Sequence, residues 1–138
     1  MIIDAVVGLN GPVTRESFGA LRIGMSREEV RELFGASWYK TFRRGQDGPE
    51  TDRYGAFGEV MVNIVDSVVS FVELAEPARP TIRGVELLGV PLSELAESLA
   101  GVGLAIDVID GAMAVIIGEG IGLYLECDVV RGVSFSEP

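Results

Sequence analysis

The feature that most constrains the fold is an internal repeat. The string IGMSREEVRELFG at Ile23–Gly35 returns in looser form as LGVPLSELAESLAG at Leu88–Gly101. Each copy is followed by a similar ending, Val-Ser-Phe and then Glu-Pro, which closes at Pro77 in the first copy and at Pro138 in the second. A pattern that recurs in the same order is typical of two units built alike. We therefore expect one compact fold with an N-terminal strand or arm over residues 1–12 and two α/β units over residues 13–78 and 79–138.

Each copy of the repeat predicts one helix. Ser26 is a good N-cap, and Glu29 three positions later completes a capping box, in which side chain and backbone satisfy each other's free N–H groups. The apolar positions that follow share one helical face, and Gly35 can end the helix in a left-handed conformation. The second copy predicts a helix that starts near Pro91 and ends before Gly101.

The remainder of each unit has the alternation and the turn residues of strands. Expected strands span Ser37–Arg43, Val60–Val65, Val68–Leu74, Leu104–Ile109, Ala112–Ile117, Leu123–Glu126 and Val129–Phe135. Asp110-Gly111 predicts a hairpin turn of type I′, because that turn needs positive φ. The glycine-rich segment Gly118–Gly122 precedes a strand and not a helix, so it predicts a turn and not a phosphate-binding loop. Residues 44–53, which contain Gly45, Gly48 and Pro49, predict a polar loop.

One helix followed by an antiparallel meander, twice over, indicates an α+β fold class with two repeated units. We expect both helices to lie on one face of the sheet. The other face would then be open to solvent or to a partner.

The string at Ile23–Gly35, followed by a meander and then repeated, resembles the tandem helix-plus-sheet units of the β-lactamase inhibitory protein superfamily. It is also similar to small-lipoprotein domains with the same helix pattern. The resemblance implies a sheet that serves as a protein-binding surface, without catalysis. This chain differs in having a single cysteine, Cys127, which permits no intramolecular disulfide, and no lipid-attachment cysteine near its start. A cytoplasmic binder, such as an immunity protein that neutralises a toxin, is the corresponding expectation.

The residue inventory argues against catalysis, metal binding and a cofactor. The chain has no histidine, which removes the commonest general base and metal ligand. Cys127 has no base to form a thiolate and is expected to be a buried or half-buried thiol on a strand. Glu126 and Asp128 lie two positions apart and could share a sheet face, as a carboxylate-based hydrolase or a calcium site would need, but no ligand-dense loop accompanies them.

The charge is strongly negative and unevenly spread. The formal net charge is −10, and residues 81–138 contain two arginines against nine acidic residues. Such a surface repels nucleic acid and attracts basic partners, unless it serves only solubility. The acidic residues expected to be exposed are Glu94, Glu97, Asp107 and Glu119. The sequence shows neither a basic, apolar leader nor a stretch of about 20 apolar residues, so we expect a cytoplasmic protein without a membrane span.

Aromatic and basic residues gather around the predicted polar loop. They are Trp38, Tyr39, Arg43, Arg44 and Tyr54, of the residue types enriched at binding hot spots. The leading hypothesis is a non-catalytic protein-binding protein, an immunity protein or an inhibitor of a basic toxin or enzyme. Alternatives are a structural or assembly module that forms a homodimer through its sheet and, in last place, a carboxylate-based hydrolase.

Overall fold

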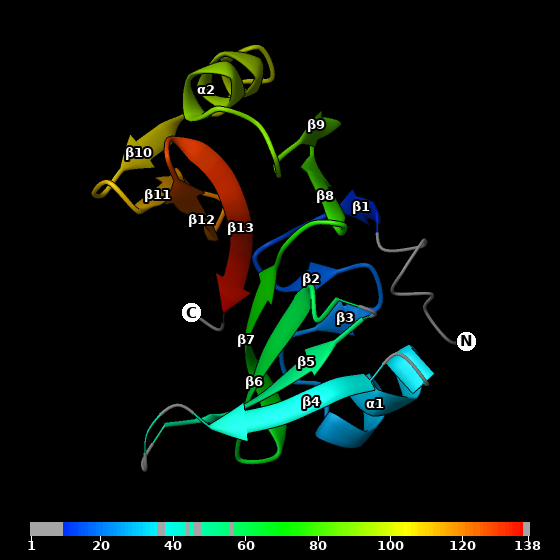
Figure 1. The fold of residues 1–138 in the computed structure, drawn as a ribbon. Coiled ribbons are helices and arrows are strands. Elements are labelled where there is room, and N and C mark those ends of the chain that lie inside the picture. Colours follow the sequence, from blue (N-terminus) through cyan, green and yellow to red (C-terminus); the bar gives the residue numbers. More distant parts are fainter. Residues whose placement is uncertain (1–9, 36–37, 44, 46–47, 56, 137–138) are drawn as a thin grey trace.

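The computed structural model describes residues 10–35, 38–43, 45, 48–55 and 57–136, with the side chains of Trp38 and Tyr39 left aside. These residues form two helices and thirteen strands (Figure 1). The helices are α1 (Arg27–Phe34) and α2 (Leu92–Ala100). The strands are β1 (Asn10–Pro12), β2 (Ser17–Phe18), β3 (Leu21–Arg22), β4 (Trp38–Arg43), β5 (Glu50–Tyr54), β6 (Val60–Val65), β7 (Val68–Leu74), β8 (Arg79–Ile82), β9 (Val85–Glu86), β10 (Ile106–Val108), β11 (Met113–Ile116), β12 (Ile121–Glu126) and β13 (Val129–Ser136).

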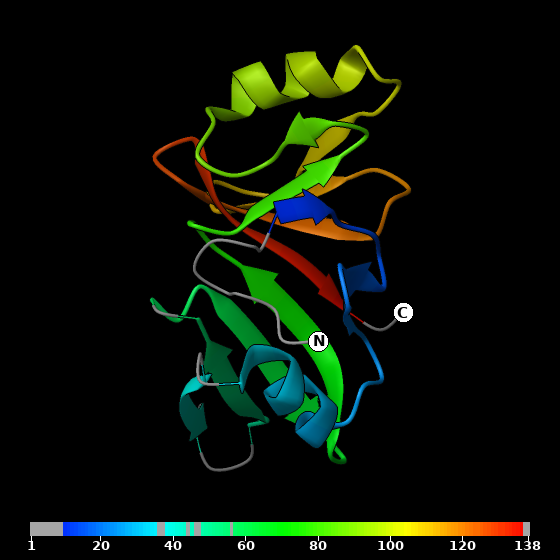
Figure 2. The ribbon, with the colours of Figure 1, turned by 90° about the vertical axis from the view of Figure 1, so that its right-hand side faces the viewer.

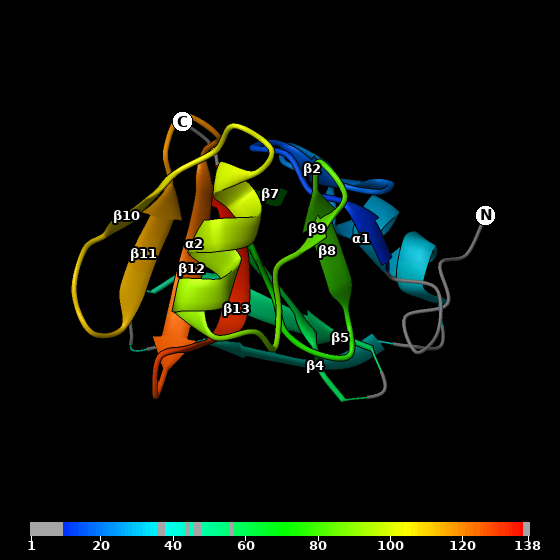
Figure 3. The ribbon, with the colours of Figure 1, turned by 90° about the horizontal axis from the view of Figure 1, so that it is seen from above.

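Eight of these strands form one antiparallel sheet in the order β10-β11-β12-β13-β7-β6-β5-β4. At its centre the last strand, β13, pairs with β7, so that Ser134 stands opposite Glu73 and Phe135 opposite Val72. The sheet is strongly twisted, and Figure 3 shows β4 running across the direction of β12 and β13. The two halves of the chain therefore share one continuous surface.

Short strands and both helices cover one side of this sheet. β1 pairs in parallel with β8, which pairs with β9, and β2 and β3 form a small hairpin. In Figure 2 these strands and α1 lie in front of the large sheet, with α2 above it. Their apolar side chains join those of the sheet in one core, to which α1 contributes Val30 and Phe34 and α2 contributes Leu95 and Leu99.

The start of each helix is tied to a tight hairpin of the sheet. The amide of Arg27 donates to the carbonyl of Ser67 in the β6–β7 turn, and the amide of Leu92 donates to the carbonyl of Asp128 in the β12–β13 turn. Both turns have two residues with positive φ, the signature of type I′. The predicted capping box of α1 is confirmed, with Ser26 Oγ accepting from the amide of Glu29 at 3.1 Å.

A buried ionic network fastens α1 to β5. The carboxylate of Asp52 is fully buried and accepts two hydrogen bonds from Arg27, each 2.8 Å long. It also accepts from Thr41 Oγ1 at 2.7 Å and from the hydroxyl of Tyr54 at 2.9 Å. The ring of Tyr54 stacks on Phe34 with centroids 4.7 Å apart. Burial alone raises the pKa of Asp52, but the hydrogen bonds from Arg27, Thr41 and Tyr54 outweigh it and hold the pKa below its ordinary value.

The expected α+β class, with two repeated helix-and-sheet units, is wrong. Strands make up 50% of the structure and helices 15%, so the fold is mostly β. The helices are only eight and nine residues long, and the β7–β13 pairing joins the meanders into a single sheet. The sequence analysis also missed the accessory strands β1, β2, β3, β8 and β9, because pieces of two to four residues carry no readable periodicity.

Two local expectations also need correction. The predicted polar loop over residues 44–53 contains β5, whose polar side chains are compensated by Arg27 and Thr41 from other elements. The hairpin at Asp110-Gly111 exists, but neither residue has positive φ. Instead, Asp110 Oδ1 accepts from the amides of Ala112 and Met113, so a side chain completes the turn.

Replacing Asp52 tests the buried network. Asp52→Ala should lower the free energy of unfolding by about 3–5 kcal/mol, because the partly buried guanidinium of Arg27 loses its partner. Glu50→Ala removes the other acidic partner of Arg27, which is 39% exposed, and should cost about 1 kcal/mol or less. Urea unfolding at neutral pH, followed by circular dichroism, measures both. Equal losses in the two variants would contradict this account of α1.

The same network should respond to acid. The folded-state pKa of Asp52 lies below the ordinary value of 3.8, so its stabilisation is complete above that value and is lost as the pH falls through the folded pKa. The difference in unfolding free energy between the wild type and Asp52→Ala should stay constant from neutral pH to about pH 5 and shrink below the ordinary pKa. A difference that shrinks already between pH 7 and pH 5 would be inconsistent with this ionisation.

Candidate functional site

The side of the sheet opposite the helices is its open face. One cross-strand row on this face runs through all eight strands and consists of Lys40, Arg53, Met61, Glu73, Ser134, Gly122, Val115 and Asp107. Side chains alternate between the two faces of a strand. The sequence neighbours of this row, such as Asp52, Val62 and Val133, are buried in the core. The row itself is exposed or half-buried, apart from any covering element among the described residues.

The open face is hollowed over β10–β13. The hollow has a volume of about 480 Å³, and its lining includes Asp107, Val115, Ile117, Gly122, Ser134 and Ser136. It exists because small residues meet across β12 and β13. A Cβ atom added to Gly122 would lie 2.6 Å from Ser134 Oγ, so a larger residue at this position would displace the serine side chain. We call this hollow the β10–β13 groove.

An unpaired carboxylate stands beside apolar side chains in the groove. Asp107 is exposed, and its carboxylate makes no hydrogen bond or ion pair within the described part of the chain. Val115 lies opposite it on β11, and Ile117 is 55% exposed. At the β11–β12 turn, Arg15 Nη2 donates to the carbonyl of Gly118 at 2.6 Å. The groove therefore combines apolar walls, backbone acceptors and one free negative charge.

The opposite end of the open face is basic. Lys40 is exposed on β4, with its ammonium 6.0 Å from the centre of the Phe42 ring. Arg53, its neighbour on β5, donates from Nε to the carbonyl of Gly58 at 3.1 Å. The open face thus runs from cationic side chains on β4 and β5 to an acidic side chain on β10.

The acidic residues proposed from the sequence divide between the two faces. Asp107 lines the groove, and Glu119 is half-buried in a turn between two glycines that line it. Glu94 and Glu97 are exposed on α2, which packs against the covered face. The structure therefore brings only two of the four acids near the open face.

The aromatic and basic candidates do not form one surface. Tyr54 is fully buried against Phe34, so it belongs to the core and offers no area to a partner. Arg43 is exposed and forms an ion pair with Glu50 at 3.6 Å. Trp38 and Tyr39 lie on β4, but their side chains, like all of Arg44, fall outside the described residues.

The residues weighed for catalysis are placed differently from expectation. Cys127 is exposed and lies in the β12–β13 turn, so the expected buried or half-buried thiol on a strand is wrong. Glu126 ends β12 and Asp128 follows in the turn, so they do not sit two apart on one strand. Among the described residues there is no group of three or more metal-binding side chains, and no helix is long and apolar enough to cross a membrane.

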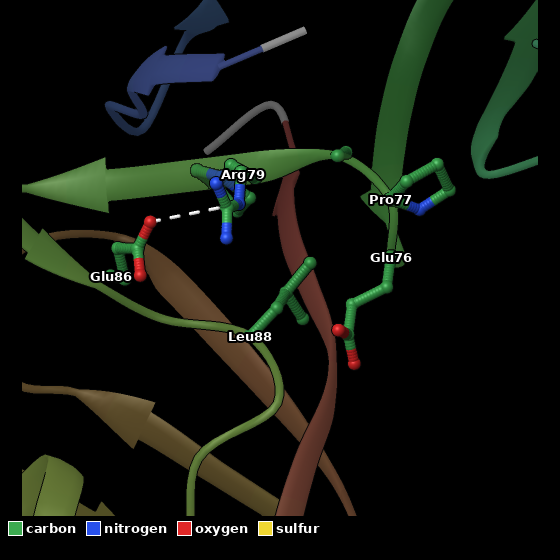
Figure 4. Close-up of a pocket in the computed structure, with 7 residues that line it drawn as sticks. Glu76, Pro77, Arg79, Glu86 and Leu88 are labelled. Atoms are coloured by element: carbon green, nitrogen blue, oxygen red, sulfur yellow. Dashed lines mark ion pairs between the residues drawn. The ribbon is translucent and has the colours of Figure 1, made fainter. Parts of the chain in front are cut away.

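A second hollow lies where β7 leads into β8 (Figure 4). Its charged groups are already engaged with one another. Arg79 forms an ion pair with Glu86 at 3.7 Å, and Glu76 does so with Arg131 at 3.4 Å. The apolar lining includes Leu88 and Pro77. With its charges paired, this hollow presents a weaker recognition feature than the groove.

Glu59 is a buried carboxylate between β5 and β6. It is 2% exposed, and neither of its oxygens has a hydrogen-bond partner in the described structure. The carboxylate packs against Gly55, where a Cβ atom would collide with it. Burial raises the pKa of Glu59, and the charge of Arg53 only partly opposes this.

Comparison of the chain with protein-family models, with curated proteins and with solved structures yields no match. Function is therefore inferred from the residues and geometry of this chain.

Glu59→Gln should stabilise the fold at neutral pH by about 1–2 kcal/mol, because it replaces a desolvated charge with a neutral amide of the same shape. The folded-state pKa is raised above the ordinary 4.5, so the ionisation penalty appears as the pH rises through this range and is absent well below it. Urea unfolding at neutral pH and near pH 3.5 measures the difference. The exposed Glu94→Gln serves as the control and should change stability little at either pH. A destabilising effect of Glu59→Gln at neutral pH would show that the ionised carboxylate is a favourable part of the fold.

Proposed function

We propose that this chain is a non-catalytic protein-binding protein whose open face receives a basic partner. Its most concrete form is an immunity protein or inhibitor that neutralises a basic toxin or enzyme. The observation that carries the proposal is the continuous open face, left uncovered by the described elements and bearing the groove with the unpaired Asp107.

The size and charge of the open face support this proposal. Eight neighbouring strands spaced about 4.8 Å apart span about 34 Å, which is wide enough for a standard protein interface. The net charge of −10 and the acidic C-terminal half favour fast association with a positively charged protein. Paired or unpaired charges at the rim then tune the rate more than the affinity.

A homodimer formed through the sheet is the second candidate function. It is favoured by apolar side chains at the edge formed by β10 and β11, where Val108, Ile109, Met113 and Ile117 are 55%, 57%, 49% and 55% exposed. Edge strands with exposed apolar groups readily pair with another chain. Light scattering of the purified protein over a range of concentrations distinguishes a monomer that awaits a partner from a stable dimer.

Site-specific photo-crosslinking tests the proposed function. A photoreactive phenylalanine at Met61, on the open face, should yield a covalent adduct of defined mass in the source cells, whereas the same residue at Ser98, exposed on α2, should not. The captured protein is then produced separately and titrated against the wild type by calorimetry. Its identity as a basic protein follows from the mass spectrum.

Filling the groove should abolish binding of that captured protein. Ser134→Trp places a bulky ring over Gly122 and should weaken binding by about 2 kcal/mol or more, as loss of a central contact does. Ser98→Trp is the matched control and should leave the affinity unchanged. Circular dichroism confirms that both variants are folded. Equal affinity for the wild type and Ser134→Trp, with loss in Ser98→Trp, would assign binding to the helical face and refute the proposal.

A further inference from the structure

We infer that the β10–β13 groove accepts a single arginine or lysine side chain, with Asp107 as its counter-ion. This inference rests on the proposed function, since it names the chemical group of the partner that the open face recognises. It goes beyond a general attraction between an acidic and a basic protein, because it assigns one position on the sheet.

The shape of the groove suits the aliphatic stem of a basic side chain. Its floor consists of small residues, Gly122 and Ser134, and its apolar wall includes Val115 and Ile117. Long basic side chains bury their methylene groups against such apolar surface and keep the charged end near water or an acid. An acidic or short polar side chain would gain little from these walls.

The charges at the groove select a cation. Asp107 has no partner among the described residues, in contrast to Asp52, Glu50, Glu76 and Glu86, which are all in ion pairs. An unpaired carboxylate next to apolar walls gains most from a cation that is brought in by a partner.

The molecule itself shows how a guanidinium can dock at the end of this groove. Arg15 reaches the β11–β12 turn from a distant part of the chain and donates to the carbonyl of Gly118, whose backbone lines the groove. The adjacent Gly120 allows this approach, since a Cβ atom there would lie 2.6 Å from Cβ of Arg15. The turn therefore already offers a backbone oxygen to one guanidinium, while Asp107 remains free for another.

A titration with small-molecule probes tests the inference without the partner. The probes are N-acetyl-L-arginine methylamide, its lysine counterpart and the neutral citrulline analogue, each added to ¹⁵N-labelled protein. Both cationic probes should shift the amide resonances of Gly118, Gly120 and Gly122, with saturation in the millimolar range. Citrulline, which has nearly the shape of arginine but no charge, should shift them much less.

Asp107→Asn should weaken the response to both cationic probes by about tenfold, the effect of losing one charge-assisted contact. Glu94→Gln is the matched control, because it removes the same charge from an exposed position on α2, and it should leave the titration unchanged. Equal weakening by the two variants, or an equal response to citrulline, would reduce the effect to general electrostatic attraction or to shape and overturn the inference. Absence of any glycine shift would overturn it as well.

The outcomes separate this inference from the proposed function. If the groove ignores the cationic probes while Met61 still crosslinks to a partner that Ser134→Trp cannot bind, only the assignment of a basic side chain fails. If the probes bind through Asp107 but no protein is captured at Met61, the groove assignment stands and the proposed protein-binding role fails.

Discussion

The pairing of β13 with β7 is the interaction on which the rest of the structure depends. It brings the last strand of the chain to the centre of the sheet and places Ser134 opposite Glu73. Because the two meanders become one sheet, their outward-facing rows merge into a single surface that crosses eight strands. The groove also depends on this pairing, since β13 supplies one of its sides. A pair of separate four-stranded sheets would offer two narrow surfaces and no shared groove.

A continuous sheet must still have one covered face, and here the cover includes a buried charge. The Arg27–Asp52 pair is costly to desolvate, and its two direct hydrogen bonds, together with those from Thr41 and Tyr54, compensate for that cost. This network holds α1 on the covered side, while the tight hairpins hold the starts of both helices. The covering elements therefore stay off the open face, and that division is what makes the open face available to a partner.

Local signals in the sequence predicted local structure well and tertiary structure poorly. The capping box at Ser26 and Glu29 predicted the start of α1 because all of its atoms lie within four residues. By contrast, β5 looks like a polar loop until Arg27 is known to lie beside Asp52, a contact between residues far apart in the chain. Cys127 was misplaced because a turn with positive φ at a non-glycine residue has no strong sequence signal.

The groove could not be predicted for the same physical reason. It depends on the register that sets Gly122 opposite Ser134, and no pattern within one strand reveals that register. Small residues at outward positions of two consecutive strands were the available signal, but the glycines were assigned to a turn instead. Asp107 was proposed from its charge alone, and its place in the groove comes only from the fold.

Carboxyl footprinting of the complex with the captured partner tests the central claim most directly. Carbodiimide-driven labelling reports the accessibility of each carboxylate, and the open face and α2 each carry exposed acids. The account predicts that the partner protects Asp107 while Glu94 and Glu97 are labelled as in the free protein. Protection of Glu94 and Glu97 with Asp107 still labelled would contradict it and place the partner on the helical side.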